Sequence, residues 1–206
     1  MNRFASVVLA IAAVAVCAGS ASASNLGPVT AASVTTYSAA STVPTSSCTS
    51  NPTQDTTIDA QHKNANNGTA TTLTIATGSK PEWGLVQFTP CAPANAAIVS
   101  AAMQLRVTLG PGAETWGVYP INGPWAETTV TWSNAPAIST TASDAQPAGA
   151  TGSTMQWSVT PDVQAIVNGG ANNGWAIEDN GANNATGTLS SREGTVKPVL
   201  SLVYYP

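Results

Sequence analysis

The sequence predicts an all-β fold, a β-sandwich with one short helix in its C-terminal third. Short apolar or alternating runs, separated by turn signals, recur about every 8 to 15 residues after Asp55, which is the spacing of sandwiches and barrels. Asn-Gly pairs at positions 67, 122, 168, 173 and 180 supply residues that tolerate the positive φ of tight turns. A single capped stretch near position 160 has a helical pattern.

The first 23 residues have the three parts of a secretory signal peptide. Arg3 gives a basic start, residues 7–16 form an apolar run, and residues 21–23 are small. The apolar run is too short for a membrane-spanning helix, and no later stretch approaches the required length. We therefore expect a secreted, extracellular chain without membrane insertion, either soluble or held at a cell surface. The alternative of a lipoprotein anchored at Cys17 is disfavoured by Val16, where a small residue is expected.

Residues 24–54 are rich in Ser, Thr, Ala and Pro and show little periodicity. Such a composition cannot bury enough apolar surface to order itself, so we expect a spacer, which is either a stalk or a disordered leader. Residues 55–206 then form one domain with a sizeable core.

Removal of the first 23 residues leaves two cysteines, Cys48 and Cys91. In an oxidising compartment an isolated pair most simply forms one disulfide. The alternative is two buried free thiols.

Ten strands are expected. Residues 103–109 show the clearest alternation, with apolar side chains at the odd positions and polar ones at the even positions, so one face is buried. The expected strands cover 56–60, 72–77, 83–89, 98–109, 115–121, 129–132, 155–159, 175–178, 187–192 and 199–205.

The one expected helix begins near Thr160, a good N-cap, followed by Pro161 at the first helical position and Asp162 at the positive end of the helix dipole. Residues 168–170, Asn-Gly-Gly, end it. Three apolar residues share one helical face: Val163, Ile166 and Val167.

The charge balance excludes several partners. The chain has six Lys and Arg residues against ten Asp and Glu residues, with no basic cluster. We therefore expect no binding of nucleic acid, of anionic membrane surfaces or of polyanionic glycans.

The sequence also offers little for catalysis. His62 is the single histidine, lies in a polar loop and is expected to be solvated; no Gly-x-Ser-x-Gly motif is present. Glu178 and Asp179 are adjacent on an expected strand, so they point to opposite faces and cannot act on one glycosidic bond. We expect that the protein is not an enzyme.

Four segments resemble one family. Residues 125–136, WAETTVTWSNAP, are similar to W-x-E-S-T-V-T-W-x-N-A-P, and residues 159–177 are similar to a V-T-x-x-V-Q-A-W-V-N-G-x-x-N-N-G segment of the DNRLRE domain, also described as carbohydrate-binding module family 96. Residues 55–75 resemble its opening strand pair, and 191–193 (S-R-E) with 198–205 resemble its closing strand.

The resemblance implies a jelly-roll-like antiparallel sandwich, secreted or on cell surfaces, usually without catalysis and in some members binding polysaccharide. Alginate-type glycans are partners of some members, but the scarcity of Lys and Arg disfavours them here. The sequence departs from the family at Gln87, Ile166 and Cys91, so ligand roles are not inherited through those positions.

The expected function is that of a secreted, non-catalytic carbohydrate-binding protein of the cell surface or extracellular matrix. Sugar sites stack rings on aromatic side chains and hydrogen-bond the hydroxyls. Four of the six tryptophans have positions typical of core packing: Trp125, Trp132, Trp157 and Trp175. The expected ligand platform consists of Trp83, Trp116, Tyr119, Glu114 and Asn122, with Glu82 beside it.

Two alternatives remain open at this point. Trp83 and Trp116 cap the core at strand ends instead, or the chain is a structural or adhesive surface protein that binds other proteins or itself. No cofactor is expected other than a structural Ca²⁺, for which hard oxygen ligands are available at Asp55, Asp59, Glu178 and Asp179, although no DxDxDG loop is present. Arg192 is expected to pair with a carboxylate or bond loop carbonyls.

Overall fold

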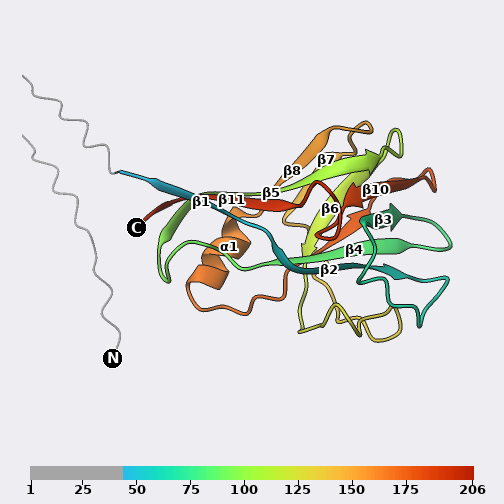
Figure 1. The fold of residues 1–206 in the computed structure, drawn as a ribbon, viewed down its shortest axis with the longest axis horizontal. Coiled ribbons are helices and arrows are strands. Elements are labelled where there is room, and N and C mark those ends of the chain that lie inside the picture. Colours follow the sequence, from blue (N-terminus) through green and yellow to red (C-terminus); the bar gives the residue numbers. More distant parts are fainter. Residues whose placement is uncertain (1–43) are drawn as a thin grey trace, which may run out of the picture. The chain divides into compact units, whose positions relative to one another are not determined.

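A computed structural model describes residues 44–206, which form eleven strands and one helix (Figure 1). The expected signal peptide, residues 1–23, and most of the expected spacer lie outside the described residues. The elements are β1 (Ser46–Ser50), β2 (Pro52–Asp59), β3 (Thr72–Ala76), β4 (Glu82–Phe88), β5 (Ala97–Leu109), β6 (Thr115–Pro120), β7 (Asp144–Pro147), β8 (Thr154–Ser158), α1 (Thr160–Val167), β9 (Trp175–Asp179), β10 (Thr186–Ser190) and β11 (Val199–Tyr205).

The strands form one continuous antiparallel path in the order β1-β11-β5-β10-β3-β4-β9-β6-β7. Two further strands join it at the side, β2 on β4 and β8 on β5. The 13-residue strand β5 links the layers. Its Met103 pairs with Leu200 of β11 and with Trp157 of β8 in one layer, whereas its Val107 pairs with Leu189 of β10 in the other. The predicted all-β, antiparallel, sandwich-like fold with one short helix is confirmed.

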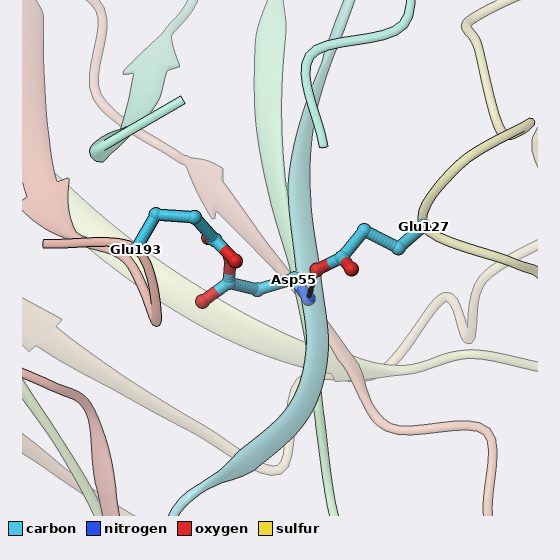
Figure 2. Close-up of side chains that lie close together, drawn as sticks. All are labelled: Asp55, Glu127 and Glu193. Carbon is cyan, nitrogen blue, oxygen red and sulfur yellow. Dashed lines mark hydrogen bonds between the residues drawn. The ribbon is translucent and has the colours of Figure 1, made fainter. Parts of the chain in front are cut away.

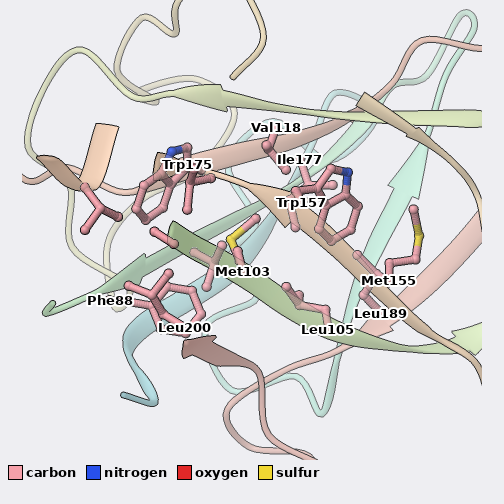
Figure 3. Packing of buried hydrophobic residues seen from close by; sticks show 14 of the residues in the cluster. Phe88, Met103, Leu105, Val118, Met155, Trp157, Trp175, Ile177, Leu189 and Leu200 are labelled. Atoms are coloured by element: carbon pink, nitrogen blue, oxygen red, sulfur yellow. The ribbon is translucent and has the colours of Figure 1, made fainter. Parts of the chain in front are cut away.

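The main core lies between the layers and is filled by large apolar side chains (Figure 3). Alternate residues of β5 point into it, as predicted: Met103, Leu105 and Val107 are buried. Trp157, predicted to pack in the core, is fully buried, and its indole N–H donates to the carbonyl of Trp116 at 2.9 Å. The polar edge of the Trp157 ring therefore has a hydrogen-bond partner inside the core.

The helix α1 forms where predicted but is capped differently. Its N-cap is Val159, without a side-chain cap, while the Thr160 hydroxyl accepts the N–H of Ala101 in β5 at 2.9 Å. Thr160 thus joins helix to sheet instead of capping the helix. Val163 and Val167 are buried, and the helix ends where Gly169 takes a φ of +94°. No helix within residues 44–206 has the length and apolar character to cross a membrane.

The predicted strand at 129–132 is wrong. The N–H groups of Thr129 and Val130 both donate to the carbonyl of Ala126, and the Asn134 side chain accepts the N–H of Thr131 at 2.7 Å. This segment is therefore a set of turns. Its alternation arises because Val130 still points inward and is buried, so apolar spacing alone did not distinguish a turn from a strand.

Strand structure begins earlier than the expected domain boundary at Asp55. β1 starts at Ser46 and pairs with β11, and β2 starts at Pro52. β1 consists of Ser, Thr and Cys and has no buried residue, so it pairs through its backbone and carries no hydrophobic pattern. The predicted disulfide is confirmed, with Cys48 of β1 bonded to Cys91 after β4 and a Cα–Cα distance of 6.2 Å.

Replacing both Cys48 and Cys91 by Ser should lower the free energy of unfolding. The bond closes a loop with a sequence separation of 43, for which the chain-entropy model gives about 4 kcal/mol. Urea unfolding of the double variant and of the parent protein, with and without a reductant, measures this difference. Equal stability of the variant and the parent protein in the absence of reductant would contradict the prediction.

Candidate functional site

The structure divides the predicted ligand residues between two faces of one sheet. Trp116 is fully buried and Glu114 is 3% exposed, so the predicted exposure of Trp116 is wrong. The reason is the alternation of β6, in which Trp116 and Val118 point into the core. Trp83 and Tyr119 are half-buried, Glu82 is half-buried and Asn122 is exposed.

Trp83 and Tyr119 lie on the same outer face of the sheet, opposite to Trp116. In the strand register Leu85 of β4 pairs with Ala176 of β9, and Ala176 pairs with Tyr119 of β6. Directly paired residues share a face, as do residues two apart in a strand. The register therefore brings these two predicted residues to one surface.

A second tryptophan from a distant segment joins this surface. Trp132 belongs to the long segment between β6 and β7, drawn in yellow in Figure 1, and its ring centroid lies 4.6 Å from that of Trp83, tilted by 52°. Both rings pack on a small second core and are half-buried. Trp125 packs there too, but its indole N–H already donates a hydrogen bond to the carbonyl of Asn173 at 2.8 Å. Trp132 was expected in the core, and no pattern in the sequence indicated its partner.

Tyr119 is held by a neighbour from the loop after β9. Its hydroxyl donates to the Asn180 side-chain oxygen at 2.9 Å. Both groups lie close over Gly117, where an added Cβ would meet the Asn180 amide nitrogen at 2.6 Å and the Tyr119 ring at 2.8 Å. The missing side chain of Gly117 therefore lets the ring and the amide lie against the strand.

Glu178 supplies a carboxylate to the same face. It is two residues from Ala176 on β9 and pairs with Gly117 of β6. Burial raises the pKa of Glu178 to about 7, and its Oε1 is buried without a hydrogen-bond partner. Near neutral pH this group can accept or donate a hydrogen bond. We call Trp83, Trp132, Tyr119, Glu178 and Asn180 the aromatic face.

An open cleft elsewhere lacks such a stacking surface. Its volume is about 340 Å³, and its lining includes Arg106 of β5, Ser190 of β10 and Glu193. The remaining lining residues are Thr71, Thr72, Thr108, Gly194, Thr195 and Val196. None of these described residues is aromatic, so the aromatic face fits the stacking of a sugar ring better.

Three carboxylates from distant segments meet around Asp55 (Figure 2). One oxygen each of Asp55, Glu127 and Glu193 lies within 4.8 Å of the others. Arg192 binds all three. Its guanidinium pairs with Glu127 at 3.3 Å and with Glu193 at 2.8 Å, and its backbone N–H donates to Oδ2 of Asp55 at 2.7 Å. The expectation that Arg192 pairs with a carboxylate is confirmed.

Asp55 is the most buried member of this acidic cluster. It is 1% exposed, and its Oδ1 has no hydrogen-bond partner. Burial raises the pKa of Asp55 to about 7; the Arg192 N–H lowers it, whereas the charges of Glu193 and Glu127 raise it. The cluster could hold a cation, but Arg192 already compensates part of its negative charge.

The structure does not assemble the predicted Ca²⁺ ligands Asp55, Asp59, Glu178 and Asp179. Asp59 binds His62 at 2.6 Å instead, and His62 is 64% exposed, which fits the predicted solvated histidine. Glu178 and Asp179 point to opposite faces, as the strand alternation predicted. The meeting of Asp55 with Glu127 and Glu193 was not predicted, because the three residues are far apart in the sequence.

An antiparallel β-sandwich that presents half-exposed aromatic rings beside polar groups on a sheet face has the architecture of a carbohydrate-recognition module. The chain belongs to carbohydrate-binding module family 96, which it matches over residues 46–204. The DNRLRE resemblance is thereby confirmed, and the match starts at the first residue of β1. Comparison with curated proteins found no match.

The raised pKa of Asp55 should appear in the pH dependence of stability. Its folded pKa of about 7 lies above the usual 3.8, so the folded state holds a proton that the unfolded state releases. The resulting stabilisation is complete below about pH 4 and is lost as the pH rises through 7. Asp55→Asn should therefore gain stability relative to the parent protein between pH 4.5 and pH 8, measured by urea unfolding at both values. A difference that is the same at both values would contradict this.

Proposed function

We propose that the protein is a secreted, non-catalytic carbohydrate-binding module of the cell surface or extracellular matrix that binds a neutral polysaccharide on its aromatic face. One observation carries the proposal: the ring centroids of the half-buried Trp83 and Trp132 lie 4.6 Å apart, with Trp83 on the sheet face that also presents Tyr119.

The aromatic face has the two components of sugar recognition. The apolar face of a pyranose ring stacks on an indole, and the hydroxyls require hydrogen-bond partners at the edge. Trp83 and Trp132 supply the rings, while Glu178 and the Tyr119–Asn180 pair supply polar atoms. The unpartnered Oε1 of Glu178 favours a ligand that donates a hydrogen bond, such as a hydroxyl.

Charge favours a neutral ligand. A carboxylate-bearing glycan would meet Glu178 at this face, and Arg192, the cation that holds the acidic cluster, is already occupied by Glu127 and Glu193. Acidic sugars are usually held by free Arg or Lys side chains.

Two further features support the proposed location and the absence of catalysis. The Cys48–Cys91 disulfide is typical of extracellular proteins, as is the signal-peptide pattern of residues 1–23. Glu178 and Asp179 face opposite sides of β9, an arrangement unsuited to the paired carboxylates of glycoside hydrolysis.

The second candidate function is that of a structural or adhesive protein, and β1 is the observation that favours it. Within residues 44–206, β1 pairs with β11 alone and stands at one end of the sheet path. An open strand edge can add a strand from another protein or from a second copy.

Pull-down against a panel of soluble and insoluble polysaccharides tests the proposal. The parent protein should bind a neutral glycan, and Trp83→Ala should weaken binding about tenfold or more because the stacking ring is lost. Tyr119→Phe should weaken it less, since only the hydroxyl is removed. Tyr205→Ala, an aromatic residue 39% exposed on β11, serves as the matched control and should bind normally.

Thermal unfolding of each variant must accompany the binding assay, because Trp83 also packs on the second core. Loss of binding in a Trp83→Ala protein that stays folded locates the site. Retention by no glycan, together with self-association in light scattering, would favour the structural alternative. Equal binding by the folded Trp83→Ala variant would exclude the aromatic face.

A further inference from the structure

A pair of carboxylates other than those of the acidic cluster is buried on the core side of the sheet. Glu114, just before β6, is 3% exposed, and Asp179, at the end of β9, is 8% exposed. Asp179 pairs in register with Trp116 of β6. The backbone at Glu114 is fixed, since its N–H donates to Gly112 and its carbonyl accepts the N–H of Ala148.

Three of the four oxygens of these two carboxylates lack hydrogen-bond partners. Both oxygens of Glu114 and the Oδ2 of Asp179 are buried and unpaired, while the Oδ1 of Asp179 accepts the N–H of Gly181 at 2.7 Å. Burying a carboxylate without partners costs several kcal/mol. A fully unpaired, buried Glu114 therefore points to a ligand that completes it.

The two side chains converge on one point. A Cβ placed on Gly181 would lie 1.4 Å from Oε2 of Glu114 and 2.9 Å from Oδ1 of Asp179. Glycine at 181 is what allows the Glu114 carboxylate to approach the loop after β9. Oε2 of Glu114 and Oδ1 of Asp179 thus both lie next to Gly181, in space that a side chain at position 181 would fill.

No positive side chain compensates this pair within residues 44–206. The salt bridges there join Arg192 to Glu127 and Glu193, and His62 to Asp59. Burial raises the pKa of Asp179; the N–H of Gly181 lowers it, the charge of Glu114 raises it, and the neighbouring indole of Trp116 lowers it. The pair differs in this respect from the acidic cluster, where Arg192 supplies the opposing charge.

We propose that Glu114 and Asp179 bind a Ca²⁺ ion. Hard carboxylate oxygens are the ligands that Ca²⁺ prefers, and it takes six to eight oxygens in flexible geometry, so water and loop carbonyls complete the shell. The segment over the pair is exposed at Asn180 and Asn183, which gives the ion access. Asn183 also donates to the carbonyl of Ala113 at 3.1 Å, which ties this loop to the residue before Glu114.

The site does not depend on the proposed sugar binding, but it adjoins it. Asn180, which accepts the Tyr119 hydroxyl, follows Asp179 directly. Asp179 was among the residues predicted for Ca²⁺ from the sequence, whereas Glu114 was placed with the sugar ligands. The register of β6 and β9 combines the two.

Terbium luminescence and thermal unfolding test the site with the purified chain. Tb³⁺ replaces Ca²⁺ at oxygen sites and emits when a nearby indole is excited; Trp116, paired with Asp179, is that indole. We expect sensitised emission that Ca²⁺ displaces. At a Ca²⁺ concentration about 100 times its Kd, the melting temperature should rise by about 5 to 10 °C over that in EDTA.

Substitutions assign the signal. Glu114→Gln should abolish the emission and the Ca²⁺ shift, yet melt in EDTA no lower than the parent protein, because one buried charge is removed. Asp179→Asn should behave alike, which covers the case in which one variant fails to fold. Glu193→Gln, which removes an acid from the other cluster, should retain both signals.

Two outcomes would overturn the proposal. If Glu193→Gln abolishes the emission and Glu114→Gln retains it, the cation binds the acidic cluster instead. If the parent protein shows neither emission nor a Ca²⁺ shift, the two carboxyl groups share a proton and bind no cation.

Discussion

The alternation of side chains along β9 sets what each face of the molecule can do. Glu178 points outward beside Tyr119, and Asp179 points inward beside Glu114. The same two-residue period in β6 buries Trp116 and presents Tyr119. A one-residue slip in this pairing would exchange both sets. The aromatic face and the buried acid pair are therefore two consequences of one register, on opposite sides of the same sheet.

Arg192 has a comparable role in joining segments that are far apart in the chain. It binds Asp55 across 137 residues, and Glu127 bonds the N–H of Asp55 across 72. Each of these residues lies in one of the segments that resemble the family. Their meeting explains in physical terms how short, separated motifs specify one fold: the buried carboxyl group of Asp55 finds its hydrogen-bond donor, the backbone N–H of Arg192, only when the distant segment is in place.

The sequence allowed prediction of what depends on local pattern. The alternation at 103–109, the helix near Thr160 and the cysteine pair were all found where expected. Errors arose where burial depends on pairing with distant strands. Trp116 was expected on the ligand platform, but the alternation of β6 points it into the main core. β1 was missed since Ser and Thr carry no apolar signal, and the partners of Asp55 required the topology.

The bond between Cys48 and Cys91 also has a mechanical consequence. β1 is the first strand of the described chain, and its hydrogen bonds to β11 are the contacts that a pull on the preceding segment would load first. Force that reaches Cys48 passes through a covalent bond to Cys91 and from there into β4 and β5. Under tension, the hydrogen bonds between β1 and β11 after Cys48 are thus protected from sequential rupture, because the disulfide transmits the force to β4 and β5.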